Sequence, residues 1–215
     1  MRALIGVGVI LVVTGCATQQ VHMQEPRRVV GTEESVRIDA EITGDQVGPN
    51  TQIPITYAIT NHRDVPIAIA DLIPDTAYDS DTQTITVSFG SEVPGESIVP
   101  RLITIAPGEQ KTFSTVAKMH IALPNLADNP LIRTPNALRV KLNFLGDTKP
   151  FKQIVNIPER AVHDPQLADA LLPAWLDANE VVYTNTLPMR WQSMAATPPE
   201  RGGAPATGRR RGRRG

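Results

Sequence analysis

Residues 138–144 read Leu-Arg-Val-Lys-Leu-Asn-Phe, with an apolar side chain at every second position. Side chains point alternately to the two faces of a β-strand, so a period of two predicts a strand with one buried face and one solvated face. The same pattern occurs at residues 36–42, where Val36, Ile38, Ala40 and Ile42 alternate with polar residues. These two stretches predict half-buried strands of the kind that antiparallel sheets contain.

Outward from these stretches, the chain shows further strand patterns separated by turns. Eight strands are predicted in all. Two are the stretches above, at residues 35–43 and 137–145, and the other six are residues 53–59, 65–69, 84–89, 101–105, 110–118 and 151–157. Asn61–Asp64 is predicted to be a hairpin loop into residues 65–69, and Pro107-Gly108 marks a tight turn between two strands. No stretch between residues 35 and 157 has a helical period, which argues against a βαβ fold. The pattern predicts an all-β protein, an antiparallel sandwich over residues 35–157.

Three segments resemble the strands and turns of immunoglobulin-like or fibronectin-III-like sandwiches. They are Ile-Thr-Tyr-Ala-Ile-Thr-Asn at 55–61, Val-Pro-Ile at 65–67 and Ile-Ala-Pro-Gly-Glu at 105–109. The resemblance covers residues 35–157 and implies an immunoglobulin-like β-sandwich. An antibody-type domain is excluded, because that region contains neither a cysteine pair nor a tryptophan.

The sequence pattern changes after Pro158, where the period of two typical of strands gives way to a helical spacing. Asp164 is a suitable N-cap, and Pro165 occupies the favoured first helical position. Leu167, Leu171 and Trp175 follow at a spacing of four, which predicts a short amphipathic helix, bent or broken near Pro173. Residues 180–186 can add one last strand. Residues 158–194 are therefore expected to form an extension packed on the sandwich, with a partner-binding helix as the alternative.

The leader ends in Val13-Thr14-Gly15-Cys16 after an apolar run that begins at Ala3. The run is too short for a membrane-spanning helix, which needs about 20 residues. The tetrad resembles the lipobox of bacterial lipoproteins. This resemblance implies a signal peptide over residues 1–15 and lipidation of Cys16. The segment from Ala17 to Glu34 is polar and has no periodicity, so residues 16–34 are expected to be a tether between the lipid and the domain. Ala17 after the cysteine favours an outer-membrane anchor, facing the periplasm, in a Gram-negative host.

The charge is distributed unevenly along the chain. Residues 17–200 carry 14 basic and 22 acidic residues, a net charge of −8, whereas six arginines follow from Arg201 onward. Residues 195–215 are expected to be a disordered Arg/Gly-rich tail. The tail is expected to be solvated, folding back on the acidic body or binding nothing specific, and the alternative is a segment that binds anionic lipid, lipopolysaccharide or an acidic protein patch. Because the lipobox implies that the protein is exported, nucleic acid is not an expected partner of this tail. The anion-binding candidates are Arg209, Arg210, Arg211, Arg213 and Arg214.

No set of residues has the spacing of a catalytic or cofactor site. Cys16 is the only cysteine, so once it is lipidated the mature domain has no thiol for catalysis, disulfides or metal binding. The four histidines follow no metal-binding motif. A segment predicted to be a loop contains Asp71 and three weak calcium candidates, Asp75, Asp79 and Asp81.

The sequence therefore favours a lipid-anchored, non-enzymatic envelope protein that binds or assembles with another envelope protein. Sheet edges and end loops are the surfaces that such modules commonly use. Two alternatives remain open at this stage. One is a periplasmic enzyme or inhibitor with an unidentified site on its loops, and the other is a structural protein that contacts anionic lipid or polymer through its tail.

Overall fold

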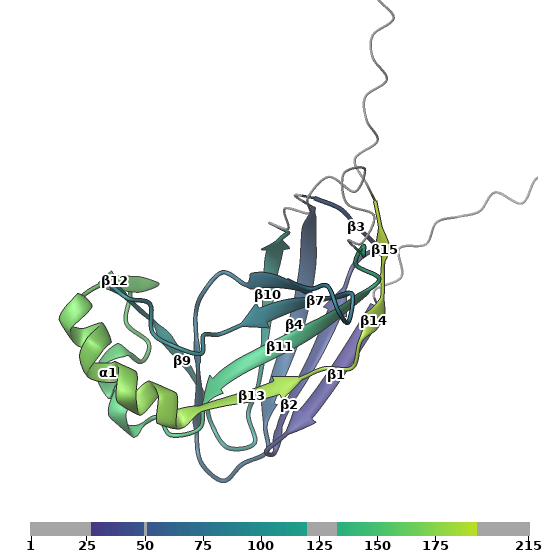
Figure 1. Cartoon of the computed structure of the whole chain (residues 1–215). Helices are drawn as coiled ribbons and strands as arrows, with labels where there is room; N and C mark the ends of the chain where they lie inside the picture. The colour runs from purple at the N-terminus through teal and green to yellow at the C-terminus, as the bar shows by residue number, and fades with distance from the viewer. Residues whose placement is uncertain (1–26, 50, 120–132, 193–215) are drawn as a thin grey trace, which may run out of the picture.

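The computed structural model describes residues 27–49, 51–119 and 133–192, and the chain in these ranges is mostly β-strand (Figure 1). Two larger sheets share one hydrophobic core. The first sheet has the order β1-β2-β4-β10, and all its neighbours are antiparallel. Its strands are β1 (Arg27–Glu33), β2 (Val36–Ile42), β4 (Gln52–Asn61) and β10 (Gln110–Lys118).

The second sheet is mixed and is built around the long strand β11 (Ala137–Leu145). Its main path runs β6-β7-β11-β5-β9, and β7 pairs with β11 in parallel. β13 and β14 also pair with β11, both antiparallel. The remaining strands are β5 (Ile67–Ala70), β6 (Asp75–Asp79), β7 (Thr84–Phe89), β9 (Leu102–Ile105), β13 (Asn179–Tyr183) and β14 (Leu187–Pro188).

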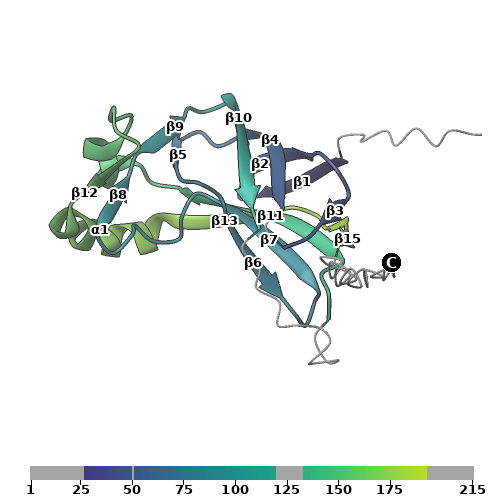
Figure 2. The same cartoon turned by 90° about the horizontal axis from the view of Figure 1, so that it is seen from above.

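Two small sheets and two helices complete the described chain (Figure 2). β8 (Ile98–Pro100) pairs with β12 (Ala161–His163), and β3 (Gln46–Val47) pairs with β15 (Arg190–Trp191). The 3-10 helix η1 spans Lys149–Ile154, and the helix α1 spans Pro165–Ala178.

The hydrophobic side chains form two cores. The larger one lies between the two sheets, where Ile38 and Ile59 of the first sheet and Val140 and Leu142 of the second are fully buried. The smaller one lies beneath α1, where Trp175 packs edge-on against Phe151 with 5.4 Å between ring centroids. Alternation therefore predicts the first core correctly, because strand side chains alternate between core and solvent.

Several predicted elements are confirmed and others are wrong. Asp164 is the N-cap of α1, and its side chain accepts a hydrogen bond from the Leu167 amide at 2.9 Å. The helix is not broken at Pro173 but continues to Ala178, because Trp175 and Ala178 extend its buried face beyond the proline. Residues 151–157, predicted as a strand, instead begin within η1, where Phe151 and Ile154 are buried one 3-10 turn apart.

The boundaries predicted for the tether and for the sandwich also need correction. Residues 27–33 of the predicted tether form β1, which pairs with β2 along its whole length. The last strand predicted at residues 180–186 is present as β13 (Asn179–Tyr183), but it is hydrogen-bonded to β11 as a member of the second sheet. β1 is joined to β2 by a turn that the local pattern does not show, and β13 is stabilised by β11, which is far from it in the sequence.

The acidic loop pocket, a candidate binding site

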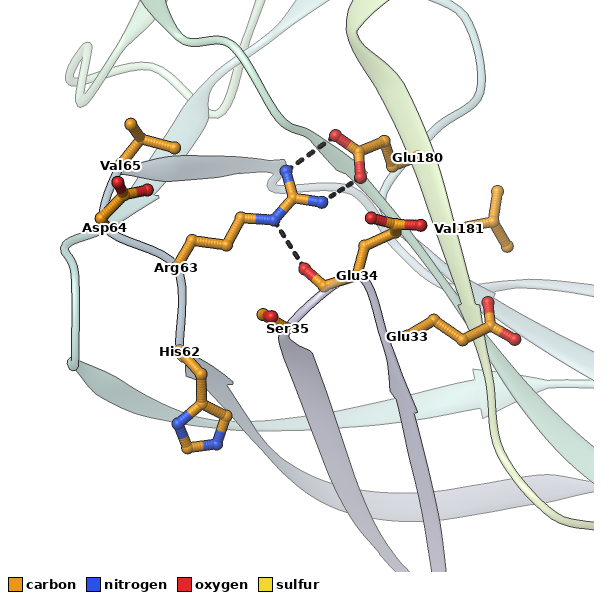
Figure 3. A pocket seen from close by; sticks show the side chains of 9 residues that line it. All are labelled: Glu33, Glu34, Ser35, His62, Arg63, Asp64, Val65, Glu180 and Val181. Atoms are coloured by element: carbon orange, nitrogen blue, oxygen red, sulfur yellow. Dashed lines mark hydrogen bonds and ion pairs between the residues drawn. The ribbon is translucent and has the colours of Figure 1, made fainter.

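An open pocket of about 1150 Å³ lies at one end of the two sheets. Three segments that are distant in the sequence meet there: the β1–β2 turn, the β4–β5 loop and the start of β13 (Figure 3). We call it the acidic loop pocket; its lining residues are Glu33, Glu34, Ser35, His62, Arg63, Asp64, Val65, Glu180 and Val181.

Arg63 joins the three segments (Figure 3). Its Nη1 donates to Glu180 Oε1 at 2.7 Å, and its Nη2 donates to Glu180 Oε2. Its Nε donates to the backbone carbonyl of Glu34 at 2.7 Å, and its guanidinium lies over the Phe144 ring at 5.1 Å from the centroid. A bidentate arginine–carboxylate pair fixes orientation as well as distance. The hydrogen bond to Glu180 is the main reason that the pKa of Arg63 is raised above its ordinary value.

The loop that carries Arg63 is held by a buried side chain at the end of β4. Asn61 is fully buried, and its Nδ2 donates to the carbonyls of Val65 at 2.8 Å and Ile105 at 3.1 Å. Its Oδ1 accepts from the Arg63 amide at 3.0 Å. Asn61 therefore satisfies two backbone groups of the loop and one at the end of β9, and this positions Arg63 toward Glu180.

Gly146 leaves room for the ion pair. A β-carbon at this position would collide with the Glu180 carboxylate and would lie 2.8 Å from Arg63 Nη1. A side chain at position 146 would therefore force the Glu180 carboxylate or the Arg63 guanidinium to shift from this geometry.

The pocket retains an excess of negative charge. Glu180 is neutralised by Arg63, whereas Glu33, Glu34 and Asp64 are exposed. Within the described ranges, no ion pair or side-chain hydrogen bond engages the carboxylates of these three residues. A concave surface with several carboxylates of one sign attracts cations. The arrangement can thus hold the ammonium or guanidinium groups of a basic segment, while Arg63 stays paired with Glu180 and stabilises the loops.

The β1–β2 turn places Glu34 and Ser35 in a left-handed backbone conformation that residues with a β-carbon disfavour. Glu34 and Ser35 have φ angles of 47° and 58°, and Glu33 pairs directly with Val36. This is the pattern of a type I′ hairpin turn, which strongly favours Asn-Gly. We therefore expect the double substitution Glu34→Asn with Ser35→Gly to raise the free energy of unfolding by about 1 kcal/mol. Urea denaturation measures this gain, and Glu33→Asn, one residue before the turn, should give none.

The structure does not bring the calcium candidates together. Asp75 and Asp79 begin and end β6, so about 13 Å of strand separates them. The Asp79 carboxylate instead accepts from the Asp81 amide at 2.9 Å and from the Thr82 hydroxyl at 2.8 Å. In the described part of the chain, no three His, Cys, Asp or Glu side chains are grouped as metal ligands. The segment predicted as a loop is a strand because Thr76 and Tyr78 alternate with exposed residues along β7.

Asp71, which the sequence groups with these aspartates, serves another role. It forms ion pairs with Arg101 and Arg160, at 3.2 Å to the latter. It therefore ties the segment after β5 to the residue just before β9 and to the approach to β12.

The other predicted site residues lie outside the described residues. They are Cys16 and the five tail arginines Arg209, Arg210, Arg211, Arg213 and Arg214. Among the described residues, no helix is both long and apolar enough to cross a membrane.

The residues that build the pocket were missed by sequence reasoning. Residues 61–64 were predicted as a hairpin loop, but β4 and β5 do not pair: β4 ends at Asn61, and the loop leads from the first sheet to the second. Nothing in the local pattern assigns Arg63 a partner 117 positions away. The available signal was the unusual Glu-Ser pair at 34–35 between two strand patterns, where a hairpin prefers Asn-Gly.

Comparisons with protein-family models, with curated proteins and with solved structures found no match to this chain.

Proposed function

We propose that this chain is a lipid-anchored protein of the bacterial cell envelope and a non-enzymatic module that binds a partner protein. In a Gram-negative host it is attached to the outer membrane through Cys16 and faces the periplasm. In this proposal the two sheets form an immunoglobulin-like β-sandwich, which presents loops at its ends for recognition.

The acidic loop pocket is the observation that carries the binding proposal. Its three segments are held in place by Asn61 and Arg63, so little ordering is needed when a partner binds. Preorganisation of this kind leaves more of the interaction energy available for affinity. The free carboxylates of Glu33, Glu34 and Asp64 favour a partner segment rich in lysine or arginine.

Site-specific photocrosslinking in cells tests this proposal. A photoreactive side chain at position 65, an exposed pocket residue whose replacement leaves every carboxylate in place, should give one crosslinked partner. The same residue at position 56, on the exposed outer face of β4, should give none. Removing two charges through Glu33→Gln and Glu34→Gln should reduce the position-65 adduct about fivefold, because a rim charge contributes up to about 1 kcal/mol.

A matched control keeps the membrane attachment separate from binding. The Glu33→Gln, Glu34→Gln protein should remain in the membrane fraction at the wild-type level, whereas Cys16→Ser should move to the soluble fraction. An adduct whose yield is unchanged by removal of both charges would contradict recognition by the acidic loop pocket. Cys16→Ser protein that stays membrane-bound would contradict the lipid anchor.

A further inference from the structure

β10 is the end strand of the first sheet, and one of its edges has no partner strand among the described residues (Figure 2). Its other edge pairs with β4 over its whole length. The Glu109 carbonyl accepts from the Asn61 amide, and the Met119 amide donates to the Thr51 carbonyl, so odd-numbered residues point their backbone groups toward β4. Backbone groups of neighbouring residues point to opposite edges of a strand. The even-numbered residues of β10 therefore present their amides and carbonyls at the open edge.

Other edges of the two sheets are covered or discourage pairing. On β1, the Val30 amide donates to Asn185 Oδ1 at 2.8 Å, and the Val30 carbonyl accepts from the Asn185 amide at 3.1 Å. On β9, the Leu102 carbonyl accepts from the Asn156 amide at 2.9 Å. β6, the end strand of the second sheet, has only five residues and begins and ends with aspartate. Short length and charge both discourage strand pairing.

The middle of β10 has none of these protections. Its sequence Thr-Phe-Ser-Thr-Val-Ala at 112–117 contains no charged residue and no proline. Within the described ranges, a residue of another strand reaches this side of β10 only at Lys118, whose carbonyl accepts from the Thr76 hydroxyl at 3.0 Å. The backbone groups of residues 110, 112, 114 and 116 thus form the β10 open edge, a template for a further strand.

A row of aromatic rings ends at this edge. Phe113 packs on Tyr57 with 5.1 Å between ring centroids, and Tyr57 stacks on Phe89 at 3.9 Å. Phe89 is buried, whereas Phe113 on the end strand is only half-buried. A half-buried ring at an open edge is buried further when a strand with an apolar residue pairs beside it, and this burial is favourable.

We propose that the strand which pairs with the β10 open edge is β10 of a second copy of this chain, in antiparallel orientation about a two-fold axis. The two four-stranded first sheets then become one continuous sheet. A two-fold contact requires a surface that is complementary to itself, and β10 meets this requirement in one register. The contact does not involve the acidic loop pocket, so it adds self-association to the proposed function.

The hydrogen bond from Thr76 selects the register. Residues that exchange hydrogen bonds across an antiparallel pair must both face the shared edge, so even-numbered residues lie opposite even-numbered residues. Because the Lys118 carbonyl already has a partner, the pairing extends over residues 110–116. Phe113 is the midpoint of this segment, and the two-fold axis therefore passes beside Phe113.

The two strands are complementary in this register. Thr112 lies opposite Ser114 of the second copy on the exposed face, and hydroxyl pairs of this kind stabilise sheets. Phe113 lies opposite its own copy at a non-hydrogen-bonded position, where side chains approach most closely, so the two aromatic rows join. Lys111 is the only charged residue of the paired segment and lies opposite Thr115, so no like charges face each other.

Sedimentation velocity of the Cys16→Ser protein without residues 1–15 tests this association away from a membrane. We expect the mass of two chains at high protein concentration. Thr112→Pro removes an amide from the β10 open edge, and proline is tolerated in an edge strand where the amide faces solvent. The substitution removes a hydrogen bond from each copy, so association should weaken by about tenfold or more. Thr112→Ala keeps the amide and should weaken association by at most about threefold.

An engineered disulfide tests the register. Gln110 lies opposite Val116 of the second copy, and Cα atoms of such hydrogen-bonded pairs are about 5.5 Å apart, which suits a disulfide. In the same Cys16→Ser background, Gln110→Cys with Val116→Cys should form a covalent dimer on oxidation with copper phenanthroline. Either cysteine alone should not, because it lies opposite valine or glutamine. Within one chain about 20 Å of strand separates the two positions, so the bond must join two copies.

Several outcomes would overturn the inference. They are wild-type protein that stays monomeric at about 100 µM, a dimer that Thr112→Pro leaves as strong as before, and single-cysteine proteins that form covalent dimers as readily as the double variant. If far-ultraviolet circular dichroism shows that Thr112→Pro has lost its fold, the cysteine pair, which alters only exposed side chains, decides alone. A monomer whose position 116 photocrosslinks a different protein in cells overturns the second copy as the occupant.

The proposed function and this inference can fail separately. The position-65 adduct in cells reports the acidic loop pocket, whereas sedimentation and the disulfide report the β10 open edge. Loss of the adduct with an intact dimer contradicts the proposed function alone. A monomeric protein that still gives the adduct contradicts this inference alone.

Discussion

Trp175→Ala is expected to lower the free energy of unfolding by about 3–5 kcal/mol, the usual range for removing a large buried aromatic side chain. Trp175 is fully buried in the smaller core and packs edge-on against Phe151. Its Nε1 also donates to the carbonyl of Ser91 at 3.1 Å. The substitution therefore leaves a cavity beneath α1 and an unsatisfied carbonyl, and both terms destabilise the folded state.

Denaturant unfolding followed by far-ultraviolet circular dichroism, which reports the backbone and not the substituted tryptophan, measures this loss of stability. Leu176→Ala is the matched control, because Leu176 is on the same helix but 57% exposed, and its truncation should cost less than about 1 kcal/mol. Trp175→Phe keeps most of the ring volume but not the donor, so an intermediate loss is expected. Equal stability of the Trp175→Ala and Leu176→Ala proteins would mean that α1 does not pack on the sheet as described.

Asn61→Ala is expected to lower the free energy of unfolding by about 2–4 kcal/mol, because each buried group left without its hydrogen bond costs about 1–3 kcal/mol. The substitution removes the partner of the carbonyls of Val65 and Ile105 and of the Arg63 amide. Water can rehydrate the more exposed amide, which keeps the total below the sum of three full penalties. The β4–β5 loop should also become free to move away from Glu180.

Two variants separate the hydrogen bonds from the mere loss of a side chain. Asn61→Asp retains the acceptor for the Arg63 amide but turns a carboxylate oxygen toward the carbonyls of Val65 and Ile105 in a buried site, so its loss should be at least that of Asn61→Ala. Asn136→Ala removes a more exposed amide that bonds Gln83, and it should cost less than about 1 kcal/mol. Thermal unfolding monitored by circular dichroism compares all three. An Asn61→Ala protein as stable as the Asn136→Ala protein would show that the buried hydrogen bonds of Asn61 make no net contribution to the free energy of unfolding.

The acidic loop pocket gives the Asn61 prediction a second consequence. If Asn61 positions Arg63, then the position-65 crosslink of the proposed function should weaken in Asn61→Ala at temperatures where the protein is still folded. This links the stability of one buried side chain to recognition at the surface, and the two effects can be measured on the same sample.

Strand predictions succeeded where burial alternates along the chain. β2, β7 and β11 were predicted within a residue or two, because each has one face in the main core. β1 was missed, since Arg27, Arg28 and Gly31 interrupt its pattern and its stability comes from pairing with β2. The strand predicted at 151–157 failed because two buried residues three apart fit a 3-10 turn as well as a strand segment.

The sequence alone determined the local properties of this protein: the period of two along residues 138–144, the N-cap at Asp164, the lone Cys16 and the separation of acidic body from basic segment. Each of these depends on residues close together in the chain. The tertiary structure alone decided that β13 joins β11, that Arg63 meets Glu180 across 117 positions and that Arg27 lies beside Pro188. These contacts depend on how the two sheets pack, and no local pattern encodes the partner of a strand or of a charge.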